Sequence, residues 1–170
     1  GHSDACSILE AAEVELALRT GDLEEAKRRS ARGVQYDLQP PIWFWYVRQL
    51  TPIKLLLAEG TPASLADARH ALESMDEQMA KIHRKTVRID VLALLSLVCY
   101  AQDDAPVAYA KLAKAVALAE PGGFIRNFVD MGQPMADLLT CLRAQSPALA
   151  PAALAHVDRI LAAFDATSTQ

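Results

Sequence analysis

The stretch that decides the fold of this 170-residue chain is Ala117-Leu-Ala-Glu-Pro-Gly-Gly-Phe-Ile-Arg-Asn-Phe-Val-Asp-Met-Gly-Gln-Pro-Met-Ala-Asp-Leu-Leu139. Pro121 predicts the end of a helix, because proline lacks an amide hydrogen and clashes with the preceding helical turn. The two glycines that follow permit the positive φ angles of a helix exit. Gly132 and Pro134 then predict the start of another amphipathic helix, since a first turn tolerates proline.

The segment between this exit and the new helix is too apolar for a free loop. Its apolar side chains are Phe124, Ile125, Phe128 and Val129. We expect them to pack, and to seat a C-terminal pair of helices on the helices that come before.

The composition of the chain favours an all-α fold with a sizeable core. Hydrophobic residues make up 52% and charged residues 22%, while aromatic residues are only 6%. No sustained alternation of apolar and polar residues indicates a strand, and no Asn-Gly or Asp-Gly pair indicates a hairpin. The net charge of −4 argues against a dedicated nucleic-acid surface, which is normally basic.

Apolar spacing predicts eight helices separated by Gly, Pro and Asp turns. In the first, we expect Ala12 and Leu16 to face inward together with Ile8 and Leu9. Ser64 is the expected N-cap of the fourth. Pro52 predicts a kink or an early break in the third. The fifth is apolar on nearly all sides over residues 91–100 and should be central. The expected helices span residues 4–20, 23–35, 42–59, 64–82, 86–102, 105–120, 135–144 and 146–164.

A short pattern recurs at intervals of 42 residues, at positions 23, 65 and 107: Leu23-Glu-Glu-Ala26, Leu65-Ala-Asp-Ala68 and Val107-Ala-Tyr-Ala110. An alanine at that place lets the two helices of a hairpin approach closely, as in tetratricopeptide-like repeats. We therefore predict a right-handed TPR-like superhelix of antiparallel helix hairpins. An ordinary antiparallel bundle, which also places alanines at such positions, is the alternative. Tryptophan at Ala68 or Ala110 should disrupt the packing.

The expected organisation has four parts. Residues 1–3 read as a cloning scar, which indicates an excised fragment, and residues 4–131 hold the TPR-like repeats. Residues 132–165 form capping helices, and residues 166–170 form a frayed tail.

No motif for catalysis, cofactor binding or metal binding is recognisable. The chain has no GxxxxGK[ST], no GxGxxG and no HExxH, and its histidines are isolated. We therefore expect no enzyme activity, no catalytic residue, no cofactor and no metal. Two basic clusters, residues 27–32 and residues 81–88, could meet an anionic ligand or DNA; we favour solvated helix faces for both.

Four consecutive aromatic residues span positions 43–46. On a helix they spread over most of the circumference, so at least one ring should be exposed, and exposed Trp and Tyr often mark recognition surfaces. Filling of gaps between repeats is the alternative. The candidate effector or partner contacts are Trp43, Trp45, Tyr46, Arg48, Arg84 and Arg88.

Three segments resemble MalT-type, LuxR-family ATP-dependent transcriptional regulators of bacteria. They are Glu13–Ala26, residues 54–72 and residues 112–139, in which Glu120-Pro-Gly-Gly-Phe-Ile-Arg126 is the most specific part. Met131 departs from the acidic residue that is usual there. In that family an ATPase module precedes a helical-repeat sensor region, and a DNA-binding helix-turn-helix follows it. The nucleotide-binding motif and the DNA-reading helix have no counterpart in this chain.

The resemblance implies a non-enzymatic sensor domain that receives a small-molecule inducer or a regulatory protein. Other domains of the parent regulator and self-association are further expected partners, with no direct nucleic-acid or membrane contact by this segment. A stand-alone TPR-like adaptor for protein–protein interaction is the alternative. Cys6, Cys99 and Cys141 form no CxxC motif, and no apolar run reaches transmembrane length, so we expect a cytoplasmic protein.

Overall fold

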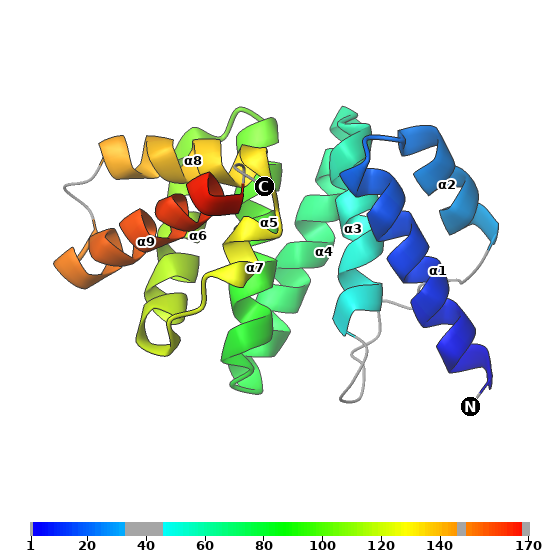
Figure 1. Cartoon of the computed structure of the whole chain (residues 1–170), viewed down its shortest axis with the longest axis horizontal. Helices are drawn as coiled ribbons and strands as arrows, with labels where there is room; N and C mark the ends of the chain where they lie inside the picture. The colour runs from blue at the N-terminus through cyan, green and yellow to red at the C-terminus, as the bar shows by residue number, and fades with distance from the viewer. Residues whose placement is uncertain (1, 33–45, 146–148, 168–170) are drawn as a thin grey trace. The chain divides into compact units, whose positions relative to one another are not determined.

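The computed structural model describes residues 2–32, 46–145 and 149–167, with the side chains of residues 2–9, 32, 46–49 and 167 left out of the description. Over these ranges the chain forms helices and no strands (Figure 1). The expected all-α class is confirmed.

The helices agree with the expected ones to within a few residues, with two exceptions. A short helix interrupts the apolar segment after Pro121, and the last helix begins at Pro151 and continues to Thr167, inside the expected frayed tail. Residues 33–35, 42–45 and 146–148 of the expected helices lie outside the described residues. The elements are α1 (His2–Arg19), α2 (Leu23–Arg32), α3 (Tyr46–Glu59), α4 (Pro62–Lys81), α5 (Lys85–Ala101), α6 (Ala105–Ala119), the 3-10 turn η1 (Glu120–Gly122), α7 (Arg126–Val129), α8 (Gln133–Ala144) and α9 (Pro151–Thr167).

The chain divides into two compact units, residues 1–71 and residues 72–170, and the division falls within α4. In the first unit α1 packs against both α2 and α3, and α2 packs against α3. Val14 and Ala17 of α1 meet Ala26 of α2 in a buried cluster, with Leu18 and Leu55 packed around it. Small residues at the centre allow these helices to approach closely.

The inward position predicted for Ala12 and Leu16 of α1 is wrong, whereas the side chains of Ile8 and Leu9 lie outside the description. Ala12 is exposed and Leu16 is 63% exposed, whereas Ala11, Val14 and Ala17 are buried. This helix carries apolar residues on more than one side, so periodicity alone does not select the buried face. The close contact with α2 selects the line of small residues, and the bulkier Leu16 remains outside.

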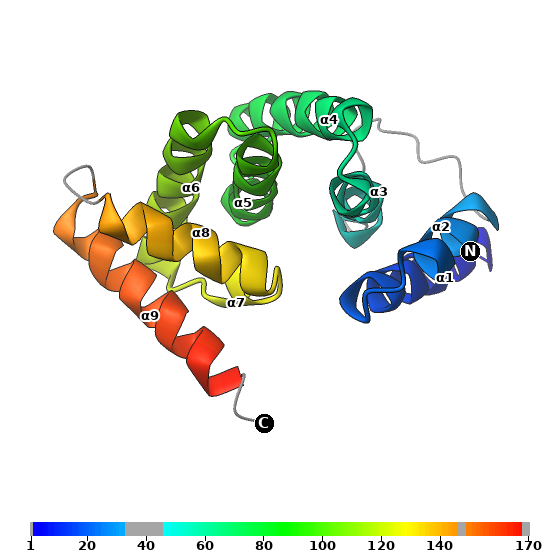
Figure 2. The same cartoon turned by 90° about the horizontal axis from the view of Figure 1, so that it is seen from above.

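In the second unit α5 and α6 form an antiparallel hairpin, and α7 and α8 pack against α5 (Figure 2). Helix α6 also contacts α8 and α9. All eleven residues from Ile89 to Cys99 are buried. The expectation that this segment is central is confirmed, because cover on every side is needed to bury such a continuous run.

Four helices end in the same hydrogen-bonding pattern. In this pattern, the Schellman motif, two consecutive residues just past the helix donate their amides back into it. The first bonds to the carbonyl three residues earlier, and the second bonds to the carbonyl five residues earlier. The first of these two residues takes a left-handed conformation, with φ from 54° to 78°. The four left-handed residues are Gly21, His83, Asp103 and Gly123.

The two glycines after Pro121 have different roles. Gly123 has a φ of 63° and provides the helix exit, as expected. Gly122 does not have a positive φ; a Cβ atom there would lie 2.2 Å from the ring of Phe124. Gly122 therefore makes room for an aromatic side chain rather than for an unusual backbone angle.

The N-cap expected at Ser64 is wrong, because α4 begins two residues earlier with Pro62 as its first residue. The Thr61 amide donates to Ser64 Oγ at 3.0 Å, and the Ser64 amide donates to Thr61 Oγ1 at 3.1 Å. This reciprocal pair resembles a capping box with Thr61 as the N-cap. Pro52 lies inside α3, which continues through it to Glu59, so an early break near Leu50 does not occur.

The third copy of the 42-residue pattern is displaced. Ala26 and Ala68 are fully buried, as expected, but Ala110 is exposed and Ala108 is buried in its place. The amide of Ala108 donates to the carbonyl of Asp104, just as the amide of Ala26 donates to that of Asp22. Ala108 therefore occupies the same helical position as Ala26, and the sequence interval misplaces it by two residues.

This correction reverses one expectation about substitutions. Ala108→Trp should lower the free energy of unfolding by about 1–3 kcal/mol or more, because a large side chain overpacks a closed contact. Ala110→Trp, on the exposed face of the same helix, should change it by less than about 0.5 kcal/mol. Urea unfolding followed by circular dichroism measures both, and equal losses for the two variants would contradict this assignment.

Candidate functional site

The predicted aromatic contacts fall largely outside what the structure describes. Trp43 and Trp45 lie outside the described residues. Tyr46 and Arg48 belong to the first turn of α3, but their side chains are not described. These four residues therefore remain predictions.

The two predicted arginines lie one helical turn apart at the start of α5. Arg84 is the exposed N-cap residue of that helix. Arg88 is only 21% exposed, and its Nε donates to Asp76 Oδ1 of α4 at 2.5 Å. Arg88 therefore joins two helices, a role that the sequence did not reveal, because nothing in the sequence pairs positions 76 and 88.

Asp76 is the centre of a charged network within the second unit. Lys114 of α6 donates to its second oxygen, Oδ2, at 3.3 Å, so the carboxylate links α4, α5 and α6. Burial raises the pKa of Asp76, but the Arg88 hydrogen bond and the charges of Lys114 and Arg88 outweigh it, and the pKa is lowered. A buried carboxylate with two cationic partners stays ionised and holds the three helices in register.

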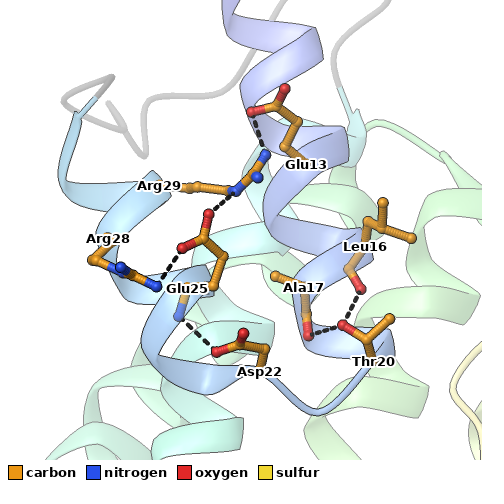
Figure 3. Close-up of polar contacts among 8 residues, drawn as sticks. All are labelled: Glu13, Leu16, Ala17, Thr20, Asp22, Glu25, Arg28 and Arg29. Carbon is orange, nitrogen blue, oxygen red and sulfur yellow. Dashed lines mark hydrogen bonds and ion pairs between the residues drawn. The ribbon is translucent and has the colours of Figure 1, made fainter.

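The first basic cluster is neutralised by carboxylates (Figure 3). Arg29 contacts Glu25 at 2.6 Å and Glu13 of α1 at 2.7 Å, and Arg28 contacts Glu25 at 2.6 Å. The hydrogen bond from Arg29 is the main cause that lowers the pKa of Glu25, and it raises the pKa of Arg29. Lys27 lies within 3.7 Å of Glu59 of α3. These three cations carry local ion pairs, which favours the solvated-face interpretation of this cluster.

The turn between α1 and α2 is closed by side chains that Figure 3 also shows. Thr20 Oγ1 donates to the carbonyls of Leu16 and Ala17 at the end of α1, at 3.2 and 3.0 Å. Asp22 Oδ1 accepts the amide hydrogen of Glu25 at 2.9 Å and caps α2. These two side chains satisfy backbone groups that have no partner within the helices.

Polar contacts also join α1 to α3. Glu15 accepts a hydrogen bond from the buried Thr51 at 2.9 Å and one from Lys54 at 2.8 Å. With Arg29–Glu13 and Lys27–Glu59, each pair among α1, α2 and α3 has at least one polar tie. The charges of this unit thus reinforce packing, and they do not converge on one point.

His156 of α9 is fully buried, and its two ring nitrogens have opposite partners. Nε2 lies 3.1 Å from the carbonyl of Phe124, and Nδ1 lies 3.0 Å from the guanidinium of Arg159. A carbonyl only accepts and a guanidinium only donates, so the ring is neutral with its proton on Nε2. His156 therefore attaches α9 to the segment after η1 as a satisfied core histidine.

Residues 1–145 of the chain match the family described as MalT-like TPR region. The chain belongs to that family. No curated protein and no solved structure matches the chain. The match spans α1 to α8, so α9 with its buried histidine lies beyond the matched part.

In this MalT-like TPR region the polar contacts between helices described above, such as Arg88–Asp76 and Lys54–Glu15, hold helices together. Over the described ranges, no three His, Cys, Asp or Glu side chains come close enough to hold a metal ion. No helix in those ranges combines the length and apolar character needed to cross a membrane.

The buried histidine of α9 gives the chain a defined response to acid. Burial lowers the pKa of His156 and the charge of Arg159 acts in the same direction, against the Phe124 carbonyl and Glu120. Because the folded-state pKa lies below the ordinary value of 6.5, the unfolded chain takes up the proton first, and stability should fall as the pH drops below about 6.5. Chemical unfolding at pH 7.5 and 5.5 should show this loss in the natural chain and a smaller one in His156→Gln.

Proposed function

We propose that this chain is the sensor segment of a bacterial LuxR-family, ATP-dependent transcriptional regulator of the cytoplasm. The match of residues 1–145 to the MalT-like TPR region is the observation that carries the proposal. The segment receives an inducer or a regulatory protein and passes the signal to the other domains of the regulator. It has no catalytic role, and it does not contact DNA itself.

The contacts within each unit support such a role. Three ion-paired helices in the first unit and the Asp76 network in the second each form a rigid group of helices. Helical groups that are rigid inside can respond to a ligand by moving as bodies, which is how many helical proteins transmit a signal. The predicted contacts Trp43, Trp45, Tyr46, Arg48 and Arg84 are the proposed receiving side chains.

A reporter assay with the full-length regulator tests this function. Deleting the segment equivalent to residues 1–145 should abolish the response of transcription to its effector, while ATP binding by the upstream module persists. A parallel thermal-shift screen of the isolated chain against a panel of metabolites should find a ligand that raises its melting temperature, since ligand binding stabilises the folded state. Effector response that survives the deletion would sink the proposal.

A stand-alone adaptor that binds other proteins is the second candidate. The observation that favours it is the exposure of large apolar side chains, among them Leu16 and Ile82, at 63% and 58%. The parent gene discriminates between the two. A nucleotide-binding loop upstream and a helix-turn-helix downstream support the regulator, and their absence supports the adaptor.

A further inference from the structure

The turn between α4 and α5, residues 81–85, is an exposed basic segment with an apolar centre. Lys81, His83, Arg84 and Lys85 are all exposed, and they surround Ile82, which is 58% exposed. We call these five residues the basic turn. It belongs to the second basic cluster of the sequence, from which Arg88 is withdrawn by its pairing with Asp76.

The basic turn joins two helix ends with opposite charge preferences. Lys81 lies in the last turn of α4, where a cation is favourable, whereas the charge of Lys85 opposes local stability. Lys85 is the first residue of α5, and the first turn of that helix carries no acidic residue. A helix N-terminus is the positive end of the helix dipole, so cations there are unfavourable. Among the described residues, no ion pair to Lys81 or Lys85 compensates this charge, whereas the cations of α2 have carboxylates beside them.

The backbone of the basic turn is explained by the helix end. His83 has a φ of 54° because it is the left-handed residue of the Schellman motif that ends α4. Ile82 exposes its side chain to water at the tip of a hairpin, where a polar residue would serve equally well. The charge of Lys85 and the exposure of Ile82 thus depart from the most stable choice within the same five residues, which is typical of a functional segment.

We infer that the basic turn docks an acidic segment of a partner protein that carries an apolar side chain. The carboxylates of the partner complement Lys81 and Lys85 and relieve the repulsion at the start of α5, and the apolar side chain covers Ile82. Nucleic acid would also complement these cations, but the net charge of the chain is −4, which disfavours a nucleic-acid surface. This inference rests on the proposed function and names the chemistry of the protein that the sensor receives.

A peptide-binding measurement tests the inference. The probe is a fluorescein-labelled 12-residue peptide that repeats Glu-Glu-Leu, and its anisotropy is followed at low salt with the whole chain. We expect binding that weakens as salt is added, because exposed charges are screened. The Lys81→Gln/Lys85→Gln variant and the Ile82→Ser variant should each weaken it about tenfold.

Two substitutions serve as matched controls. Arg126→Gln removes a cation that is 79% exposed, and Leu16→Ser removes an exposed apolar side chain elsewhere. Both should bind the peptide as the natural chain does. Circular dichroism spectra of all four variants should match that of the natural chain, and none of their melting temperatures should fall, because every substituted side chain is on the surface.

Three results would overturn the inference: no binding of the peptide, equal binding by the basic-turn variants and the controls, or a preference for a 12-base-pair DNA duplex over the peptide. The outcome is separable from the proposed function. Peptide binding at the basic turn, together with a regulator whose response survives deletion of this segment, supports the docking surface and removes the sensor role. If deletion abolishes the response and the peptide does not bind, the sensor role is supported and the docking surface is removed.

Discussion

Phe128→Ala is expected to lower the free energy of unfolding by about 4 kcal/mol, because removing a fully buried aromatic ring leaves a cavity. Helix α7 has only four residues, too few to be stable alone, and Phe128 is its buried residue. The helix packs against α5, α8 and α9. Loss of this ring should therefore loosen the C-terminal helices as well as α7 itself.

Phe124→Ala is the matched control, since it removes the same side chain four residues earlier. Phe124 is 36% exposed, and its carbonyl, which contacts His156, is unaffected by the substitution. The loss should be about 2 kcal/mol, because this side chain buries less area and its removal leaves no closed cavity. Urea unfolding monitored by circular dichroism gives both values. Similar losses for the two variants would mean that Phe128 does not anchor α7.

Asp76→Asn is expected to cost about 3 kcal/mol at neutral pH, because it leaves Arg88 and Lys114 without their shared carboxylate. This free-energy cost is at the low end of the range for breaking a buried ion pair, because the Arg88 side chain remains 21% exposed and can be hydrated. The same unfolding experiment measures it. Arg88→Gln combined with Asp76→Asn should cost less than the sum of the two single changes, since the first change already removes the main contact.

The difference in stability between the natural chain and the Asp76→Asn variant should depend on pH. The folded-state pKa of Asp76 is lowered from 3.8, so its stabilising contribution is fully present above about pH 4 and is lost as the pH falls through the folded value. The difference in stability between the natural chain and the variant should therefore be constant from pH 7 to pH 5 and should shrink in stronger acid. A difference that does not change with pH would show that the carboxylate charge is not responsible.

The sequence predicted the helices well because their ends are marked by residues with strong local preferences. Pro121 and Gly123 end one helix, and Asp22 caps another. Such signals act within a few residues of the chain. Their effect on the helix ends therefore depends little on contacts with distant parts of the chain.

The sequence predicted buried faces and polar partners less well, because these depend on residues far apart in the chain. Leu16 resembles a core residue by type, yet the contact with α2 uses the smaller Ala17. The pairing of Asp76 with Lys114 joins positions 38 residues apart. By contrast, the pair Glu25–Arg29 follows the i, i+4 rule and could have been found from the sequence.

The candidate site was the least predictable part. Arg88 resembled a ligand contact because it ends a basic run, but its charge is used inside the fold. The neighbouring basic turn keeps its cations and its isoleucine at the surface. Sequence spacing could not separate these two kinds of cation, because only the position of Asp76 distinguishes them.

The continuous burial of residues 89–99 in α5 has a practical consequence for any shortened version of this protein. A chain cut after Glu120 would lose α7 and α8, and leucine and valine side chains of α5 that these helices cover would face water. Exposed apolar surface of that kind causes aggregation and attracts chaperones and proteases. The C-terminal helices are therefore a condition for solubility, and expression boundaries should be placed after them.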